Sequence, residues 1–141
     1  MPITIQKKPT AKLARAEMIV RRILVVDAEA PIREVVVACL KRLGGWEVLT
    51  ATTGQEALQK SRSEQPDVIV VDGMMPEMND FTFLKRLRAD AATQKIPVVL
   101  LTPNRYLSGS QLFSHLGIVL TIPKPFQSVD LVQKIAQVMG W

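Results

Sequence analysis

Residues 23–34, ILVVDAEAPIRE, decide the fold class of this chain because they join a strand pattern directly to a helix pattern. The first four residues are apolar, which is typical of a buried strand, and Pro31 suits the first turn of a helix. Asp27 and Glu29 occupy the joint, and two acids at a strand end indicate that a cation or a phosphate is handled there. Ala28, which lies directly after Asp27, can ligate nothing. The stretch predicts an α/β unit with a polar site at its joint.

The same alternation of strand and helix continues along the chain. Apolar runs that predict strands lie at residues 22–26, 46–49, 68–71, 98–101 and 118–120. Helical patterns follow them, beginning near Pro31, Thr53, Asn79, Leu107 and Ser128. Such alternation predicts a parallel sheet with right-handed crossovers, and continuously apolar strands indicate that both faces of the sheet are covered. The predicted fold is an α/β three-layer sandwich with a five-stranded parallel sheet and five helices.

Polar residues suggest how three of these helices begin. Thr53, with Glu56 three residues later, forms a capping box, in which each side chain bonds a free backbone N–H of the other residue. Asn79 and Ser128 are residue types that commonly cap a helix N-terminus. We therefore expect all three side chains at N-caps.

Composition favours one globular domain. The chain has 141 residues, of which 48% are hydrophobic and 22% charged, both ordinary values for such a domain. Its longest apolar runs have five or six residues, far short of the ~20 that a membrane span needs, and no secretory signal is visible. The single cysteine, Cys39, rules out an internal disulfide and suits a reducing compartment. We therefore expect a cytoplasmic protein without membrane association.

The net charge of +5 belongs to the first part of the chain. Residues 1–22 contain six basic residues and one acidic residue, so the other 119 residues are electrically balanced. We expect residues 1–21 to form a basic arm, either disordered or folded as a short helix. The arm lacks interleaved aromatic residues and any recognition motif, which makes nucleic-acid binding the less favoured interpretation.

Four polar residues lie just past predicted strands: Asp27, Asp72, Thr102 and Lys124. Singly, each has a structural explanation as a turn, cap or surface residue. Ligands of open parallel sheets, however, bind beyond the carboxyl ends of the strands, where these four side chains should meet. Two carboxylates repel each other unless a cation lies between them, a carboxylate can attack phosphorus, and a lysine can neutralise phosphoryl oxygens. With no Gly-rich nucleotide loop present, the pattern predicts a site that receives a phosphoryl group without holding a nucleotide.

Four segments that include these residues resemble the receiver domains of bacterial response regulators. The segments are ILVVDAE, DVIVVDGMMPEMND, VVLLTP and PKPF, and they occur in the order and spacing of that family. The resemblance covers residues 22–141 and implies a flavodoxin-like, doubly wound fold. It implies that Asp72 is the phosphoacceptor, that Thr102 is the switch hydroxyl, and that Lys124 stabilises phosphoryl charge.

The resemblance also implies a cofactor. Mg²⁺ would be bound by Asp72 and the backbone carbonyl of Met74, with Asp27 acting partly through water and Glu29 a candidate for a water-mediated contact. In relatives, the peptide bond before the proline that follows the invariant lysine is cis, and the same is expected here.

The implied role is that of a signalling protein and not of an enzyme, beyond self-catalysed phosphoryl transfer and dephosphorylation. A histidine kinase or a phosphotransfer protein would donate the phosphoryl group. Few residues follow the last predicted helix, so we expect a stand-alone receiver without a DNA-binding output domain. Its output would pass through an unidentified protein target, or through a homodimer formed by the fourth helix, fifth strand and fifth helix.

Departures from the family pattern leave a second hypothesis open. Ala28 replaces the second acid, which in relatives ligates the metal directly, and Asp80, Pro103 and Thr121 also stand at positions where relatives usually differ. Losing even an indirect partner weakens metal binding roughly 10- to 100-fold, which is about 1.4–2.8 kcal/mol, so we expect Mg²⁺ to bind weakly. The alternative is a pseudo-receiver, a phosphorylation-independent interaction module. Against it, a pure scaffold has no physical need to keep Asp72 together with a lysine and a threonine.

Overall fold

A computed structural model describes residues 20–102 and 114–141 of the chain. Its core is one sheet of five parallel strands in the order β2-β1-β3-β4-β5. The strands are β1 (Arg22–Val26), β2 (Glu47–Ala51), β3 (Val68–Asp72), β4 (Val98–Thr102) and β5 (Ile118–Pro123). The predicted five-stranded parallel sheet is thus confirmed, with β2 starting one residue later than expected. Most of the predicted basic arm and of the predicted helix from Leu107 to Leu116 lie outside the described residues.

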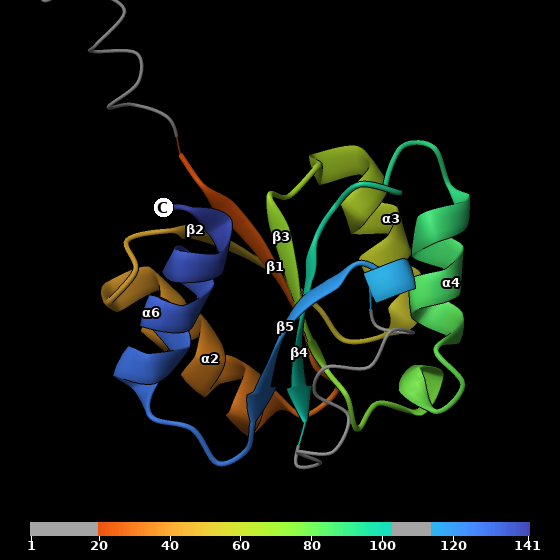
Figure 1. Ribbon diagram of the computed structural model, residues 1–141. Coiled ribbons are helices and arrows are strands. Elements are labelled where there is room, and N and C mark those ends of the chain that lie inside the picture. Colours follow the sequence, from red (N-terminus) through yellow and green to blue (C-terminus); the bar gives the residue numbers. More distant parts are fainter. Residues whose placement is uncertain (1–19, 103–113) are drawn as a thin grey trace, which may run out of the picture.

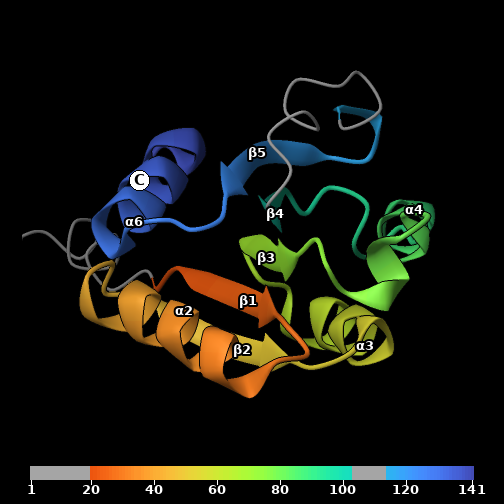
Figure 2. The same cartoon turned by 90° about the horizontal axis from the view of Figure 1, so that it is seen from below.

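Helices cover both faces of the sheet, so the predicted three-layer sandwich is confirmed (Figures 1 and 2). The helices within the described ranges are α2 (Ala30–Arg42), α3 (Gly54–Glu64), the 3-10 helix η1 (Pro76–Met78), α4 (Thr82–Ala89) and α6 (Ser128–Met139). Helices α2 and α6 pack on one face, and α3 and α4 pack on the other. Among the described residues, no helix is long and apolar enough to cross a membrane.

Alternation along the strands explains the two cores. Ile23 and Val25 of β1 point to the face of α2 and α6, whereas Leu24 and Val26 point to the face of α3 and α4. All four side chains are at most 1% exposed. Every residue of β3 and β4 is buried too, as expected for central strands of a sheet covered on both sides.

The start of α3 confirms one predicted cap. The Thr53 side chain accepts a hydrogen bond from the Glu56 backbone N–H. In return, the Glu56 carboxylate accepts a hydrogen bond from the backbone N–H of Thr52, at 2.7 Å, instead of that of Thr53. The capping box therefore closes one residue earlier than the ideal pattern.

The other two predicted caps were wrong. Asn79 ends η1 and does not begin α4; the Asp80 carboxylate instead accepts a hydrogen bond from the backbone N–H of Thr82, the first residue of α4. Ser128 is the first residue within α6, and its hydroxyl oxygen lies 3.0 Å from the Cys39 sulfur, which donates to it. The Ser128 hydroxyl thus bonds a side chain of another helix instead of capping α6.

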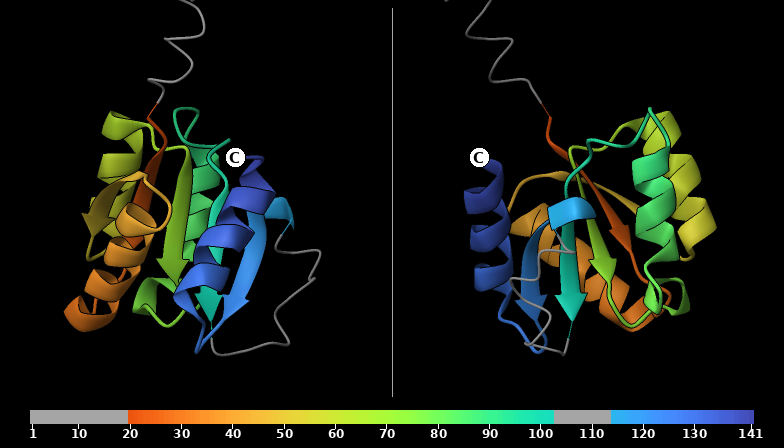
Figure 3. Two further views of the ribbon diagram at one scale, coloured as in Figure 1. Left: turned by 90° about the vertical axis from the view of Figure 1, so that its left-hand side faces the viewer. Right: turned by 45° about the vertical axis from the view of Figure 1, so that its right-hand side comes forward.

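Aromatic side chains gather at the amino end of the sheet, where the strands begin. The rings of Trp46 and Trp141 meet edge to face, with their centroids 5.1 Å apart. The guanidinium of Arg21 lies 5.2 Å from the centroid of the Trp141 ring. The start of β1 and the C-terminus consequently lie at the same end of the molecule (Figure 3).

Candidate functional site

The predicted site residues lie at the carboxyl end of the sheet, where the strand order reverses. Strands β1 and β3 are neighbours, and Val26 pairs with Val71, so Asp27 and Asp72 follow this pair on adjacent strands. The chain leaves β1 toward β2 on one side and reaches β3 on the other, which makes this the switch point of the fold. Both aspartates are buried, at 1% and 4% exposure.

Asp72 is held by two hydrogen-bond donors. Lys124 Nζ lies 2.9 Å from its Oδ1 atom, and the Met74 backbone N–H donates to the same oxygen at 3.0 Å. The side chain of Lys124 is 20% exposed and that of Asp72 is 6% exposed. This ion pair is therefore largely shielded from water, which strengthens its electrostatic interaction compared with a surface pair.

Asp27 is less well satisfied than Asp72. Its Oδ1 atom accepts a hydrogen bond from the Glu29 backbone N–H at 2.9 Å, but its buried Oδ2 atom has no hydrogen-bond partner among the described residues. Burial raises the pKa of the Asp27 carboxyl, and the negative charge of Asp72 raises it further, against the lowering effects of the Glu29 N–H and the charge of Lys124. An acid in this position lacks a cation close enough to offset its burial.

These residues fit a cation in part. The orphaned oxygen of Asp27 and the carboxylate of Asp72 offer oxygen ligands on neighbouring strands, and Mg²⁺ prefers such ligands while keeping several waters. Within residues 20–102 and 114–141, however, no three acidic, histidine or cysteine side chains come together as a metal cluster. The side chain of Glu29 is exposed. Because position 28 is an alanine, a metal here would depend on two carboxylates, backbone carbonyl oxygen and water.

The remaining two predicted residues come together on β4 and β5. Thr102 ends β4 with 4% exposure, and its backbone oxygen accepts a hydrogen bond from the Lys124 N–H at 2.9 Å. The peptide bond between Lys124 and Pro125 is cis, as expected from the resemblance. The structure therefore brings all four strand-end residues to one rim.

Two residues at this rim were missed by the sequence analysis. Arg33 donates from Nη1 to the backbone oxygen of Asp27 at 2.8 Å, and Glu77 accepts from the backbone N–H of Gly54 at 2.8 Å. A basic residue one turn into the helix after Asp27 is a signal that could have drawn attention to Arg33. Glu77 offers no such signal because its partner lies 23 positions away.

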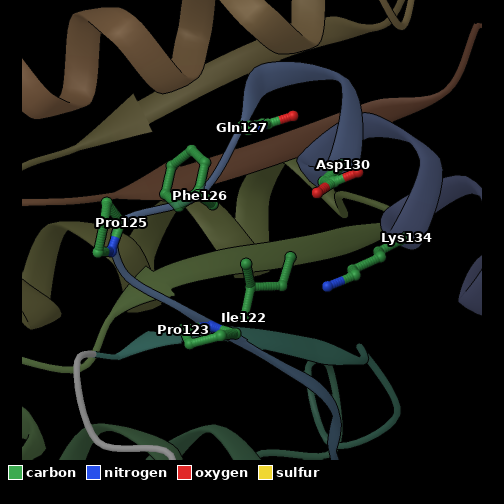
Figure 4. Close-up of a pocket in the computed structure, with 7 residues that line it drawn as sticks. All are labelled: Ile122, Pro123, Pro125, Phe126, Gln127, Asp130 and Lys134. Atoms are coloured by element: carbon green, nitrogen blue, oxygen red, sulfur yellow. The ribbon is translucent and has the colours of Figure 1, made fainter.

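A separate hollow of about 420 Å³ lies between the end of β5 and the first turns of α6 (Figure 4). Ile122 and Phe126 contribute apolar surface to it, and Asp130 and Lys134 of α6 contribute charged groups. None of the four strand-end residues lines this hollow. It is therefore not part of the acidic site.

Comparison with known proteins identifies the family. The model of the response regulator receiver domain matches residues 23–136. This chain belongs to the response regulator receiver family. Receiver domains are signalling proteins and generally not enzymes; they typically bind Mg²⁺, and they interact with histidine kinases or phosphotransfer proteins and with downstream targets.

Relatives of two lengths match this receiver domain. The phosphate regulon transcriptional regulatory protein PhoB of Klebsiella pneumoniae is 37% identical over 119 residues, which are 84% of this chain and 52% of that protein. The chemotaxis protein CheY1 of Helicobacter pylori is 32% identical over 120 residues, 84% of this chain and 97% of that protein. The chain thus spans about half the length of its PhoB relatives and nearly the full length of CheY1.

A solved structure supports the fold assignment. The chemotaxis response regulator CheY4 of Vibrio cholerae superposes with a TM-score of 0.75 at 32% identity, over 85% of this chain and 99% of that one. The predicted flavodoxin-like, doubly wound architecture is confirmed by this similarity.

Proposed function

We propose that this receiver domain accepts a phosphoryl group on Asp72 from a histidine kinase or a phosphotransfer protein. The observation that carries the proposal is the shielded pair of Asp72 and Lys124, with 2.9 Å between Oδ1 and Nζ. A lysine in this position supplies a positive charge beside the phosphoryl group, whose oxygens gather negative charge during transfer.

The transfer has a simple balance of bonds. A carboxylate oxygen of Asp72 attacks phosphorus, the new O–P bond forms, and the P–N bond of a donor phosphohistidine breaks. The imidazole nitrogen keeps the electron pair of the broken bond. Oδ1 already accepts hydrogen bonds from Lys124 and Met74, which supports Oδ2 as the attacking atom.

Mg²⁺ is part of the proposal. When bound, it would offset the charge of the carboxylates and of the incoming phosphoryl oxygens. Asp27, Asp72 and the Met74 backbone carbonyl would hold it, with Glu29 as a candidate for a contact through water. Because Ala28 supplies no ligand, we propose weak binding, with the metal needed at higher concentration than in receivers that have two acids at the end of β1.

Thr102 and the output surface complete the proposed signalling cycle. We assign the Thr102 hydroxyl, at the end of β4, the role of bonding a phosphoryl oxygen once transfer has occurred. Displacement of Thr102 toward the phosphoryl group would change the output surface expected from the sequence, which consists of the fourth predicted helix, the fifth strand and the fifth helix. The change would alter an interaction with a protein target or a second copy of the chain. The boundaries of the basic arm (1–21) and of the receiver (22–141) and a cytoplasmic location belong to the same proposal.

A second candidate function rests on Ala28. If two carboxylates do not retain Mg²⁺, the same fold acts as a pseudo-receiver, an interaction module that needs no phosphorylation. The absence of a three-residue metal cluster from the described part of the chain favours this alternative. The shielded pair of Asp72 with Lys124 favours the acceptor.

Intact-protein mass separates the two functions. The protein is incubated with Mg²⁺ and acetyl phosphate beside an Asp72→Asn variant and a sample with chelator. We expect a gain of one phosphoryl group that requires Mg²⁺ and is missing from the variant. If no gain appears at high Mg²⁺, the Ala28→Asp variant is tested: labelling there would identify Ala28 as the cause, and its absence there too would support the pseudo-receiver.

A further inference from the structure

One hydrogen bond joins the loop after Asp72 to the start of α3. The backbone N–H of Gly54, the first residue of α3, donates to Oε2 of Glu77 at 2.8 Å. Glu77 is the middle residue of η1, within the loop that leads from β3 to α4. Gly54 is buried, and a Cβ atom added to it would lie 3.1 Å from Glu77 Cγ. Glycine at position 54 thus lets the Glu77 side chain approach the helix end closely.

Backbone hydrogen bonds and buried side chains hold the loop residues between Met74 and Glu77 in place. Met75 N–H bonds the Asp72 oxygen at 3.3 Å, and Met78 N–H bonds the Met75 oxygen at 2.8 Å. The side chains of Met75 and Met78 are buried, whereas that of Met74 is 66% exposed. The backbone of Met74 is therefore held by its own N–H bond to Asp72 Oδ1 and by its buried neighbours, and not by its own side chain.

Gly54, the partner of Glu77, follows closely on the end of β2, which is hydrogen-bonded to Asp27. The Asp27 N–H donates to the oxygen of Ala51, the last residue of β2, at 3.0 Å, and α3 begins three residues later. The Glu77 carboxylate also lies at the N-terminus of a helix, where the partial positive charge of the peptide dipoles favours an anion. Glu77 thus connects the segment next to Asp27 with the loop next to Asp72.

We propose that Glu77 is a positioning residue, which holds the loop so that the Met74 carbonyl is placed for Mg²⁺. The proposal rests on the proposed function of the site as a Mg²⁺-dependent phosphoacceptor. Because Ala28 removes one carboxylate, the backbone carbonyl supplies a larger share of the protein ligands. Its placement is then more important in this chain than in a site with three acids.

Three variants of the full chain test this role. Glu77→Ala removes the acceptor of the Gly54 hydrogen bond, and Glu77→Gln keeps a carbonyl oxygen in its place. Glu34→Ala is the matched control, because it removes one exposed carboxylate from α2, away from the loop. Amide spectra of ¹⁵N-labelled protein report the Gly54 N–H directly, and they show whether each variant is folded.

The decisive readout is a Mg²⁺ titration followed at the amides of Gly73 and Met74. For Glu77→Ala we expect a half-saturating concentration raised about 3- to 10-fold, less than the roughly 10- to 100-fold typical of direct partners of metal ligands. Glu77→Gln should recover most of this loss, and Glu34→Ala should match the wild type. Acetyl phosphate labelling should show the same shift in Mg²⁺ requirement, with an unchanged rate at saturating Mg²⁺.

Unchanged Mg²⁺ affinity in a folded Glu77→Ala variant would overturn the proposal, as would a wild-type protein whose amides do not respond to Mg²⁺. Should Glu77→Ala not fold, Gly54→Ala displaces the carboxylate in its place and is expected to raise the half-saturating concentration in the same direction. A wild type that binds Mg²⁺ but takes up no phosphoryl group would refute the proposed function alone, because the titration still measures the effect of Glu77.

Discussion

The two ends of the sheet use charge in opposite ways. At the amino end, Arg22 Nε lies 2.5 Å from Glu47, its Nη1 bonds the Glu64 oxygen at 2.9 Å, and its backbone N–H bonds Asp67 at 2.8 Å. The side chains of Arg22 and Glu47 are 38% and 45% exposed. At the carboxyl end, two buried carboxylates share one nearby lysine, and an oxygen of Asp27 has no hydrogen-bond partner among the described residues.

Within one sheet, this difference assigns the charges at the amino end to stability and those at the carboxyl end to function. Charges at the amino end remain exposed to water, where an ion pair contributes about 0–1 kcal/mol. Charges at the carboxyl end are buried in excess of one sign, an arrangement that destabilises the fold. Such unmatched burial is typical of functional sites.

Replacing Lys124 would change the carboxyl end most. In Lys124→Met, a side chain of similar length loses its charge, and we expect phosphoryl labelling to slow at least ~100-fold, as when a charge-stabilising donor is lost from an enzyme site. The pKa of Asp27 should rise further, because the charge of Lys124 now lowers it. Intact mass against time measures the rate.

The control for this prediction is Lys134→Met, which removes a cation from α6 that does not contact Asp72. A Lys124→Met rate within a few-fold of this control would show that the ion pair does not support transfer.

Adding the missing acid at position 28 would increase the excess of negative charge at the carboxyl end and so enlarge its difference from the amino end. We expect Ala28→Asp to lower the half-saturating Mg²⁺ concentration roughly 10- to 100-fold. Without Mg²⁺, the third carboxylate should reduce the free energy of unfolding through repulsion by Asp27 and Asp72. Urea unfolding with and without Mg²⁺ tests both statements, and Ala91→Asp, at another exposed alanine, controls for added charge alone. Equal Mg²⁺ stabilisation of Ala28→Asp and wild type would contradict the assignment of position 28.

Neutralising Asp27 would remove one buried negative charge from the carboxyl end and so reduce its difference from the amino end. An acid whose pKa is raised in the folded state destabilises the fold once it is ionised. Its penalty is absent below its ordinary pKa of 3.8 and grows as the pH rises through the folded pKa. We therefore expect Asp27→Asn to raise the free energy of unfolding at neutral pH by on the order of 1 kcal/mol, because the amide carries no charge that is desolvated or repelled by Asp72.

The pH dependence of this gain is the discriminating feature. Urea unfolding of both proteins without Mg²⁺ should give free energies that converge as the pH falls toward 4. A gain that is constant across the whole range would attribute the effect to packing and not to ionisation.

Breaking a pair at the amino end should have the smallest effect. For Glu47→Gln, we expect a loss below about 1 kcal/mol that shrinks at high salt, because the pair with Arg22 is exposed. Mg²⁺ affinity and phosphoryl labelling should not change. A decrease of several kcal/mol in the free energy of unfolding, measured in urea at low salt, would contradict this prediction. It would show that the exposed pair at the amino end contributes as strongly as a buried one.

The sequence was sufficient for those parts of the fold that depend on local periodicity. The apolar runs predicted the strands, and their ends correctly predicted that Asp27, Asp72, Thr102 and Lys124 meet at one rim. Local patterns failed where a distant partner competes for a side chain. The Ser128 hydroxyl bonds Cys39 and does not cap α6.

Backbone conformation was a second source of error. Phe81 precedes α4 in the left-handed region, with φ of 60°, so the helix starts later than the cap expected at Asn79. Contacts such as that of Glu77 with Gly54 depend on how loops from different crossovers meet, which no periodicity within one segment encodes.

The tryptophan cluster has a practical consequence for spectroscopy. Both tryptophans of the chain, Trp46 and Trp141, lie together at the amino end, separated from the acidic rim by the length of β1, about 16 Å at ~3.3 Å per residue. Ultraviolet emission of this protein therefore originates almost wholly from one location, where α6 ends beside the turn that precedes β2. Its intensity should follow the docking of α6 during unfolding, and it should respond little to Mg²⁺. Tryptophan fluorescence therefore measures folding independently of Mg²⁺ binding and phosphoryl transfer.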